Sequence, residues 1–310
     1  MQSNRREILT HLSRGPISGP ALAEALGISR AAVWKHIETL RAHGFEIESG
    51  PDGYAVTELP EFGGDAVQYE LDVPYTVVYR EEADSTNDIA RELAGDGAEN
   101  VVVLAGAQPG GRGRLGRDWA GPPGGIYMSI LLRPSLPPAR VPLLTLAGAV
   151  AVTRAVAAVG VEATIKWPND VLSDGRKLSG ILTEMEGELD AVNWVIVGIG
   201  LNANVPRSDL PENATSLQML RDEPVVRREV VTAIVEQFHR YRSSPDEILD
   251  DWRELADTLG RRVRVETQTG HVEGIARDVS ESGSLIVETA DEAVHVHSGD
   301  CEHLRPVDGG

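Results

Sequence analysis

The sequence has a single cysteine and no sign of a targeting segment. With Cys301 alone among 310 residues, no disulfide forms within the chain, and the composition suits a reducing cytoplasm, where we expect the protein to work. No N-terminal stretch joins a basic start to an apolar run, so we expect no signal peptide. The most membrane-like stretch, Leu143–Val161, contains Arg154 and is bounded by Pro142 and Gly160. We predict a buried, alanine-rich helix there and no membrane contact.

Lysine is also scarce. Lys35, Lys166 and Lys177 are the only lysines, and 48 acidic residues against 29 basic ones give a formal net charge of −19. An acidic, lysine-poor surface suits a protein in concentrated salt, where screening suppresses repulsion between like charges. We infer a salt-loving host; the alternative is an ordinary acidic cytosolic protein. In such a chain Lys166 and Lys177 stand out, because they lie close together in the sequence.

Glycine and arginine are concentrated in Gln108 to Arg117, read as QPGGRGRLGR. The segment lies between two apolar runs, Val101–Ala107 and Ile126–Leu132, which predict strands. Glycines let the backbone approach a ligand closely, and guanidiniums donate paired hydrogen bonds to carboxylate or phosphate. We therefore predict an anion-binding loop rather than a flexible, solvated tract. It is not a P-loop, because no Gly-Lys-Ser/Thr follows and the next apolar segment predicts a strand.

Residues 1–58 have the pattern of a winged helix-turn-helix DNA-binding domain. Helical spacing of apolar residues over 5–13, a short helix over 21–26 and a third helix capped by Ser29 precede a hairpin that would form the wing. Residues 1–57 have as many basic as acidic residues, six of each, which is weak for DNA binding but far more basic than the rest of the chain. A helical dimerisation or docking domain is the alternative. The predicted DNA contacts, on or beside the third helix, are Arg30, Trp34, Lys35 and Arg41.

The rest of the chain divides into three predicted segments. Residues 59–72 hold a proline, two glycines and several acids, and predict a linker. Residues 73–258 alternate strand and helix patterns and predict the central domain. Residues 259–310 hold short strands separated by turns, which predict a small SH3-like β-barrel. The predicted fold class is α+β, with a winged helix-turn-helix before a mixed-sheet central domain and a barrel after it.

Three motifs lie in the central domain. Lys166–Asp170 (KWPND) places a lysine at a strand end, where we favour a phosphate or carboxylate contact over a solvated terminus. Asp84–Asn87 opens a helix and by itself would be an ordinary N-cap cluster. Gly198–Ala203 matches the dinucleotide-binding fingerprint, but Pro206 and Pro211 follow where that motif needs a helix. We expect a strand that leaves a buried sheet through tight turns.

Together these pieces resemble the biotin protein ligases, in particular the bifunctional form that is also the biotin operon repressor. The resemblance covers essentially the whole chain, in domain order and in motif order. Its specific parts are Ser85–Asn87 (STN), Gln108 with Gly111–Arg117 (GRGRLGR), Lys166–Asp170 (KWPND), Arg176–Leu182 (RKLSGIL) and Gly198–Asn202 (GIGLN). The resemblance implies a central domain of the class II synthetase-like kind, with a mixed sheet and helices largely on one face.

The resemblance also implies a two-step reaction. The biotin carboxylate attacks the α-phosphate of Mg-ATP, so that pyrophosphate leaves and biotinyl-5′-AMP forms. A lysine amine of a biotin carboxyl carrier domain then attacks the mixed anhydride and releases AMP. Bringing two anions together requires cations aimed at both. The implied partners are biotin, ATP with Mg²⁺, the carrier domain, operator DNA and a second copy of the chain in a homodimer.

Roles for individual residues follow from the same resemblance. Lys166, Arg112 and Arg114 are expected to be catalytic. The residues expected to bind biotin are Ser85, Thr86, Asn87, Gln108, Arg112, Gly113, Arg114 and Lys166. The residues expected to bind the nucleotide are Arg114, Arg117, Lys166 and Asn202. Asp170 is expected to bind Mg²⁺ or to orient Lys166. The loop 203–217 is expected to close over the adenylate, but it has no aromatic residue that could stack on adenine.

Two other functions stay open at this point. A lipoate ligase would share the catalytic fold, although the N-terminal and C-terminal domains and the Ser-Thr-Asn set argue against it. A transcription factor whose ligase-like domain only senses a metabolite would keep the DNA-binding pattern. The presence of Lys166 and of every arginine in the loop argues against that inactive form.

Overall fold

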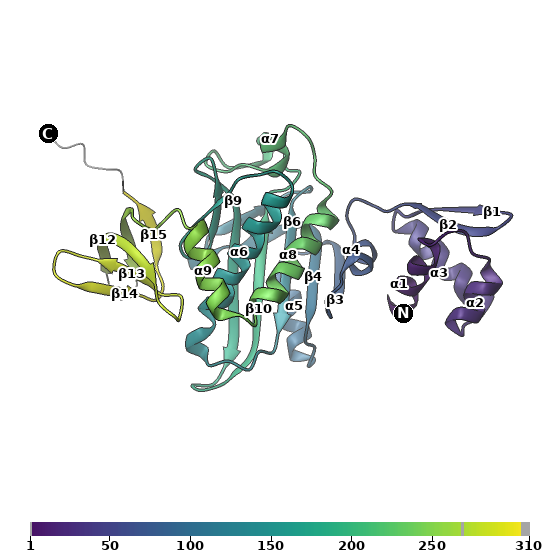
Figure 1. Ribbon diagram of the computed structural model, residues 1–310, viewed down its shortest axis with the longest axis horizontal. Helices are drawn as coiled ribbons and strands as arrows, with labels where there is room; N and C mark the ends of the chain where they lie inside the picture. Colours follow the sequence, from purple (N-terminus) through teal and green to yellow (C-terminus); the bar gives the residue numbers. More distant parts are fainter. Residues whose placement is uncertain (1, 268–269, 305–310) are drawn as a thin grey trace.

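Three bodies follow one another along the chain and lie roughly in a row, with the N-terminal domain and the C-terminal sheet at opposite ends (Figure 1). The computed structural model describes residues 2–267 and 270–304. The central body carries one large mixed sheet. The predicted α+β class is therefore confirmed.

The N-terminal domain consists of three helices and a β-hairpin, as the sequence predicts. Its elements are α1 (Gln2–Leu12), α2 (Gly19–Leu26), α3 (Arg30–Ala42), β1 (Glu46–Gly50) and β2 (Gly53–Glu58). The Ser29 hydroxyl accepts a hydrogen bond from the Ala32 N–H at 3.1 Å and so caps α3. Apolar side chains from all three helices form its core, namely Ile8, Leu9, Leu12, Leu22, Val33, Ile37 and Leu40.

One mixed sheet organises the central domain. Across the sheet its strands are β3 (Thr76–Glu82), β4 (Val101–Arg112), β6 (Ile126–Leu132), β10 (Val192–Leu201), β9 (Arg176–Gly187), β8 (Asp170–Ser173) and β7 (Thr164–Lys166). β3 and β4 are parallel and the other neighbours antiparallel. β5 (Asp118–Gly121) pairs with the far end of β4. Since side chains alternate along a strand, Val102 and Leu104 of β4 enter one apolar cluster while Val101 and Val103 enter another.

Helices cover the two faces of this sheet unequally. α6 (Pro142–Ala158), α8 (Arg227–Tyr241) and α9 (Pro245–Leu255) share one apolar cluster with the sheet, while α5 (Thr86–Gly95) packs on the other face. The stretch 138–158 is long and apolar enough to cross a membrane, yet 72% of its apolar 18-residue window is buried in the domain. The predicted buried helix is confirmed. The shorter elements are α7 (Leu217–Arg221) and 3-10 turns at 114–116, 138–140 and 207–209.

A helix occupies most of the segment predicted to be a linker. α4 (Gly64–Glu70) packs against α1 of the N-terminal domain and against α8 and β3 of the central domain. Asp65 on α4 is buried and accepts a hydrogen bond from Arg5 Nε at 2.8 Å, and its carboxylate lies 2.6 Å from His43 Nδ1. The segment is too short to show a clear helical period, so its glycine and acid content suggested an irregular linker. That prediction is corrected: a packed helix joins the two domains.

The C-terminal domain is a five-stranded antiparallel sheet. Its strands in spatial order are β14 (Ala293–Val296), β13 (Leu285–Glu288), β12 (Gly270–Val279), β11 (Arg262–Thr267) and β15 (Asp300–His303). The outer strands β14 and β15 are not paired with each other in the part of the chain described. The prediction of short strands is confirmed, and the closed barrel is not.

Thr258 and His303 join this sheet to the central domain. The Thr258 hydroxyl accepts a hydrogen bond from the Trp167 N–H at 2.9 Å and lies 3.1 Å from His303 Nε2. Because the hydroxyl accepts from Trp167, its own hydrogen is free to point at His303, which suits a neutral imidazole. Burial lowers the pKa of His303 below its ordinary 6.5, and the nearby charge of Lys166 lowers it further.

Acid should therefore loosen this junction. A lowered pKa means that His303 stabilises the folded state fully above its ordinary pKa and that this stability is lost as the pH falls through the folded value. We expect the thermal midpoint to fall between pH 7 and pH 5, and to fall less in His303→Gln. The measurement is thermal unfolding against pH, with the exposed His295→Gln as control. Equal pH dependence in parent and His303→Gln would contradict the assignment.

Candidate functional site

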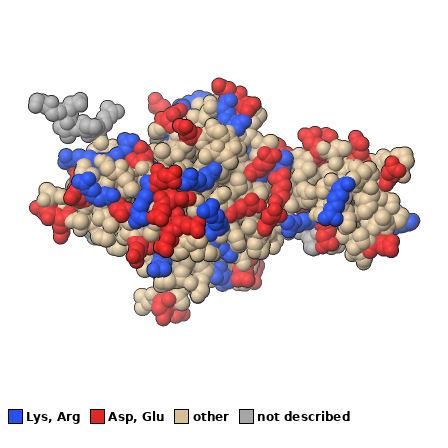
Figure 2. All heavy atoms as spheres, in the orientation of Figure 1, with Lys and Arg blue, Asp and Glu red and all other residues tan. Residues whose placement is uncertain are grey.

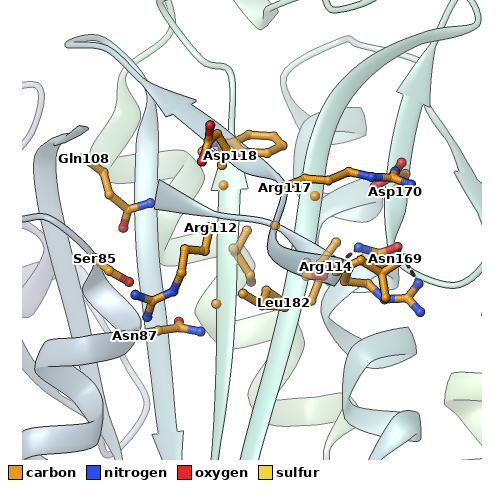
Figure 3. A pocket seen from close by; sticks show the side chains of 18 of the residues that line it. Ser85, Asn87, Gln108, Arg112, Arg114, Arg117, Asp118, Asn169, Asp170 and Leu182 are labelled. Carbon is orange, nitrogen blue, oxygen red and sulfur yellow. Dashed lines mark hydrogen bonds between the residues drawn. The ribbon is translucent and has the colours of Figure 1, made fainter. Parts of the chain in front are cut away.

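A cavity opens where the far end of β4 and the strand β5 meet the start of α5 and the strands β9 and β10. The labelled side chains fall into two groups, with Ser85, Asn87, Gln108 and Arg112 at one end and Arg114, Arg117, Asn169 and Asp170 at the other (Figure 3). The lining residues include Ser85, Thr86, Asn87, Gln108, Arg112, Gly113, Arg114, Arg117, Trp119, Asp170, Lys177 and Asp300. The cavity thus has a neutral polar end and a cationic end.

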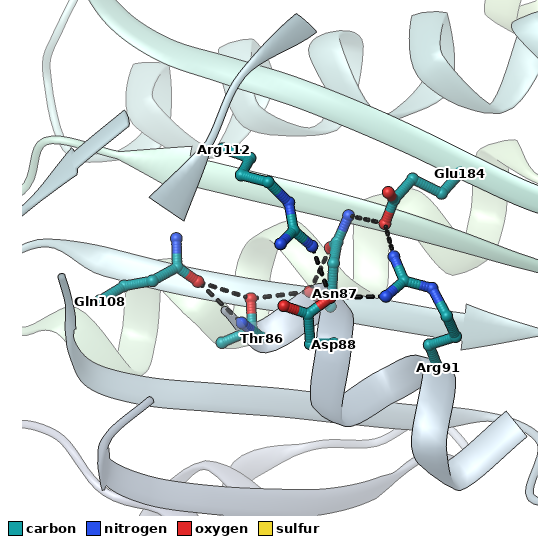
Figure 4. A network of polar contacts seen from close by, with 8 residues as sticks. Thr86, Asn87, Asp88, Arg91, Gln108, Arg112 and Glu184 are labelled. Atoms are coloured by element: carbon teal, nitrogen blue, oxygen red, sulfur yellow. Dashed lines mark hydrogen bonds and ion pairs between the residues drawn. The ribbon is translucent and has the colours of Figure 1, made fainter. Parts of the chain in front are cut away.

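Amides and hydroxyls at the neutral end bond to one another (Figure 4). Gln108 Oε1 accepts from the Thr86 N–H at 2.8 Å and from its hydroxyl at 3.1 Å. The Ser129 hydroxyl lies 2.7 Å from Thr86 Oγ1 and 2.6 Å from Asn87 Oδ1, and Asn87 Nδ2 donates to Glu184 at 2.8 Å. The Ser85 side chain makes no capping bond to α5. The tetrapeptide is therefore more than an N-cap, since its buried side chains form one wall of the cavity.

Carboxylates or carbonyls hold each of the arginines that line the cavity. Arg112 pairs with Asp88, and that hydrogen bond lowers the pKa of the Asp88 carboxyl below its usual range. Arg117 pairs with Asp300 of β15, whose pKa is lowered for the same reason.

Arg114 differs because no carboxylate of residues 2–267 or 270–304 pairs with it. It donates to Asn169 Oδ1 at 3.2 Å and to the Gly299 carbonyl at 3.0 Å. Burial lowers the pKa of Arg114, but a guanidinium remains charged at any physiological pH. An incoming anion would find this cation fixed in place and without a carboxylate partner.

Lys177, and not Lys166, lines the cavity. Its ammonium lies 2.7 Å from Asp170 Oδ1 and 5.3 Å from the centre of the Trp119 ring. Lys166 in β7 is the cross-strand neighbour of Asp170 in β8. Its ammonium lies near β15, where its positive charge acts to lower the pKa of Asp300 and that of the buried Cys301. Lys166 is not among the lining residues, so its expected contact with the reacting anions stays a prediction. Asp170 pairs with Lys177 and makes no ion pair with Lys166 among the described residues.

Asn202 and the loop that follows it support the cavity from outside. Asn202 is buried, and its amide donates to the Thr215 carbonyl at 3.0 Å. Within the loop 203–217, Ala214 bridges to Lys177, and the Thr215 N–H donates to the Lys177 carbonyl at 2.9 Å. Neither Asn202 nor any residue of that loop is among the lining residues. The prediction that Asn202 contacts a ligand is corrected to a role in holding the backbone of Lys177.

Two glycines of the Gly198–Asn202 segment leave room for lining side chains. A Cβ at Gly198 would lie 2.4 Å from Asn87 Oδ1, and one at Gly200 would lie 2.5 Å from the Trp119 indole. Such distances are shorter than any ordinary contact, so neither neighbour could keep its position. The segment is a β10 strand inside the sheet, as expected, and its glycines shape the cavity.

Sequence reasoning missed several residues of this site. The first half of the predicted loop continues β4 as far as Arg112, and only 114–116 form a turn. Trp119 on β5 is the aromatic ring that lines the cavity in the described chain, and Asp300 reaches it from the C-terminal domain. The motif that contains Lys177 was recognised, so a second lysine candidate was available from sequence. No sequence signal pointed to Asp300.

The N-terminal domain carries a separate candidate surface on α3. Arg30, Trp34 and Lys35 are exposed, and Trp34 keeps 58% of its surface accessible. Arg41 is engaged instead, because it donates to the Ile47 carbonyl at 2.7 Å, to Ser49 at 2.8 Å and to Glu38 at 2.8 Å. Arg41 thus holds the hairpin against α3, and its expected DNA contact stays a prediction.

The comparisons with known proteins cover every domain. Residues 80–202 match the Biotin/lipoate A/B protein ligase family, residues 4–55 an HTH domain and residues 258–304 the Biotin protein ligase C terminal domain. The chain is 39% identical over 305 residues to the bifunctional ligase/repressor BirA of Bacillus spizizenii, covering 92% of this chain and 93% of that protein. It is 37% identical over 315 residues to BirA of Bacillus subtilis, covering 96% of each.

Solved structures agree in fold. The biotin protein ligase from Aquifex aeolicus in complex with biotin and ATP superposes with a TM-score of 0.62 at 27% identity, covering 75% of this chain and 100% of that one. The ligase from Leishmania major in complex with biotin gives a TM-score of 0.52 at 28% identity, with 75% and 99% covered. Since the matches span the N-terminal, central and C-terminal domains, the chain belongs to the biotin protein ligases of the bifunctional ligase/repressor kind.

Proposed function

We propose that this protein activates biotin with ATP, transfers it to a lysine of a biotin carboxyl carrier domain, and represses transcription in response to biotin. One observation carries the catalytic half. A single cavity joins an end of buried amides and hydroxyls, with Arg112 beside them, to an end with Arg114, Arg117 and Lys177. A ligand with a neutral hydrogen-bonding head and a carboxylate tail fits both ends, and biotin has that form.

The neutral end would hold the ureido ring. Ser85, Thr86 and Asn87 line this end with hydroxyls and an amide, and Ser129 holds Thr86 and Asn87 from behind, in a buried setting where hydrogen bonds discriminate strongly between ligands. The Gln108 Nε2 amide has no acceptor among the described residues and can donate to a ligand, because only Oε1 is engaged by Thr86. A dithiolane ring, as in lipoate, has no N–H or C=O group to bond to this polar wall. This supports biotin over the lipoate-type alternative.

The cationic end would hold the two reacting anions. The biotin carboxylate oxygen forms a bond to the α-phosphorus of ATP while the bond to pyrophosphate breaks. Negative charge builds on the α-phosphate oxygens during that step, and Lys177 with Arg114 would stabilise it. Lys177 replaces Lys166 in this role, because it lines the cavity and Lys166 does not. In the second step the carrier amine attacks the biotinyl carbonyl carbon, and AMP leaves with the electron pair of the broken bond.

Asp170 is the carboxylate that we assign to Mg²⁺. No group of three or more His, Cys, Asp or Glu side chains lies close enough to hold a metal in residues 2–267 and 270–304. Magnesium commonly takes one or two protein carboxylates and completes its shell with water and substrate phosphates, so a single Asp170 is compatible. When bound, the ion would neutralise part of the polyphosphate charge. Asp170 meanwhile holds the Lys177 ammonium in the cavity.

Trp119 is the aromatic residue that we assign to contact with the adenylate. It lines the cavity, and its indole Nε1 is buried without a hydrogen-bond partner in the described chain. We assign to its ring a flat apolar contact with the nucleotide, beside Arg114 and Arg117.

The remaining parts of the proposal concern partners and setting. We propose operator DNA as the ligand of Arg30, Trp34 and Lys35, a homodimer through the central domain, and the cytoplasm as the compartment. A C-terminal sheet that closes as an SH3-like barrel also stays a proposal.

Pyrophosphate release tests the catalytic half directly. The assay uses the full chain at high salt with ATP and either biotin or lipoate, followed by transfer of labelled biotin to a carrier domain. We expect release with biotin and not with lipoate. Release with lipoate alone would favour the other ligase, and release with neither acid would favour a metabolite sensor.

The two β10 glycines should affect the two substrates separately. Gly198→Ala displaces Asn87 and should raise the KM for biotin about tenfold through lost hydrogen bonds. Gly200→Ala displaces Trp119 and should raise the KM for ATP instead. KM values for both substrates in both variants are the measurement, with Gly95→Ala as control, because a Cβ there meets nothing within 4 Å. If each variant raised both KM values equally, the glycines would only stabilise the fold.

A further inference from the structure

A second cavity lies at the opposite end of the central sheet. β4 begins beside it, after Glu99 and Asn100, and reaches the first cavity at its other end. Its volume is about 480 Å³, within the range of small-molecule pockets. The apolar part of its lining is Leu132, Leu136, Leu143, Leu144 and Ile248. The proposed ligase reaction uses none of these residues.

Three arginines line the same cavity. They come from separate segments: Arg133 follows β6, Arg140 ends the 3-10 turn before α6, and Arg242 follows α8. Glu99 is the one carboxylate among the lining residues, so the charged side chains leave a net of two positive charges there. The starts of α6 and α9 also reach the cavity, and helix N-termini add a smaller positive potential.

Hydrogen bonds hold Arg133 and Arg242 in place, but no carboxylate in the described chain neutralises their charge. Arg133 donates to the carbonyls of Ala98 and Asn193, each at 3.1 Å. Arg242 donates to Asn100 Oδ1 at 3.0 Å and lies 5.5 Å from the centre of the Tyr75 ring. Carbonyl and amide oxygens orient a guanidinium without cancelling its charge. The Arg140 guanidinium has no partner at all in the described part of the chain.

All three arginines of this cavity lack a carboxylate partner among the described residues. The chain has 48 acidic residues, and in the first cavity Arg112, Arg117 and Lys177 each pair with one. Arg133, Arg140 and Arg242 have no carboxylate oxygen within 4.0 Å in residues 2–267 and 270–304. Because the chain is so rich in acidic residues, a shortage of carboxylates does not explain why these three arginines lack a carboxylate partner. Positive potential concentrated in a cavity with apolar walls selects an anion.

We propose that this cavity binds an amphipathic anion, a carboxylate or phosphate monoester that carries an apolar chain. Its head would contact Arg140, with Arg133 and Arg242 on either side, and its chain would pack on Leu136 and Leu143. A fully hydrophilic polyphosphate fits less well, because it would leave the apolar wall exposed and would face Glu99. The proposal does not depend on the ligase assignment, since the two cavities share no lining residue.

Octyl phosphate is the probe that tests this site. Calorimetric titration of the full chain at fixed ionic strength, with saturating biotin and ATP, keeps the first cavity filled. We expect one octyl phosphate per chain, and binding at least about tenfold weaker for inorganic phosphate and for octanol, because each has half of the recognised groups. Octanol binding as tightly as octyl phosphate would overturn the anion assignment. No heat and no stabilisation with octyl phosphate would overturn the site.

Matched arginine variants locate the binding. Arg140→Ala should weaken octyl phosphate binding about tenfold, since one charge-assisted contact is lost. Arg80→Ala is the control: Arg80 is exposed and likewise lacks a carboxylate partner among the described residues, but it lies at the far end of β3. Pyrophosphate release should be the same in parent and in both variants, which shows that the fold is intact. Equal weakening by Arg80→Ala, or none by Arg140→Ala, would contradict the proposal.

Discussion

Lys177→Ala should lower the rate of pyrophosphate release by about a hundredfold or more, because removal of one charge-assisted contact to a phosphoryl transition state costs about 3 kcal/mol. Lys177 is one of three lysines, lines the cavity beside Arg114 and is held there by Asp170 at 2.7 Å. Initial rates with saturating biotin and ATP at high salt measure the effect. Thermal unfolding of the variant checks that the fold is kept.

Lys166→Ala provides the matched control. It removes the same charge from a neighbouring strand, but Lys166 lies outside the lining of the cavity. We expect its rate to stay within a few-fold of the parent. If Lys166→Ala lost the activity and Lys177→Ala kept it, the role first inferred from the KWPND motif would be correct.

Lys177→Arg separates charge from geometry. Arginine keeps the positive charge, but its planar fork cannot replace a compact ammonium between Asp170 and the Trp119 ring. Partial recovery relative to Lys177→Ala would show that charge stabilisation is a separable part of the effect. Full recovery would mean that position matters little.

The two lysines show where sequence reasoning reaches its limit. Lys166 and Lys177 flank β8, and each lies at the end of a strand that pairs with it. A strand pattern shows that a residue is at a strand end, but it does not show which neighbouring domain covers that end. β15 covers Lys166, and its pairing with β11 is a long-range contact that no local pattern contains.

Local signals were sufficient elsewhere. Ser29 caps α3 as predicted, because an N-cap depends on residues within one turn. Apolar runs such as Ile126–Leu132 gave the buried strands with their bounds. The wall formed by Thr86, Asn87 and Gln108 was expected from family resemblance, and the structure gives the physical reason, a closed set of buried hydrogen bonds. Asp300 could not be found, because it reaches the cavity only through domain packing.

The charge distribution matters for the regulatory half of the function. Figure 2 shows acidic side chains gathered over α9, whose sequence holds Asp246, Glu247, Asp250, Asp251 and Glu254. With a net charge of −19, long-range repulsion from DNA must be screened before α3 can approach a major groove. DNA binding should therefore need strong salt, against the usual weakening with salt.

A path of contacts connects the catalytic cavity to the DNA-binding domain. Arg227 at the start of α8 donates to the Gly125 carbonyl at 3.0 Å, next to the loop that follows β5. The same guanidinium donates to Glu61 Oε1 at 3.0 Å and lies 4.2 Å from the centre of the Phe62 ring, both just before α4. If the loop that follows β5 moves when a ligand binds, Arg227 would transmit that movement to α4, the helix that joins the N-terminal and central domains.

DNA affinity should rise by about a hundredfold or more when biotin and ATP are present, because a dimer of winged domains engages two half-sites and the second contact becomes intramolecular. The test is a titration of the chain's own promoter DNA in strong salt, with and without biotin plus ATP. Trp34→Ala should lose binding in both conditions, since Trp34 is exposed on α3. The Lys177→Ala variant should bind DNA weakly in both conditions, because it binds biotin and ATP but does not join them into the adenylate. Weak binding by this variant would show that the adenylate, and not the separate substrates, is the signal. Equal affinity of the parent with and without the substrates would leave a ligase whose N-terminal domain has no regulatory role.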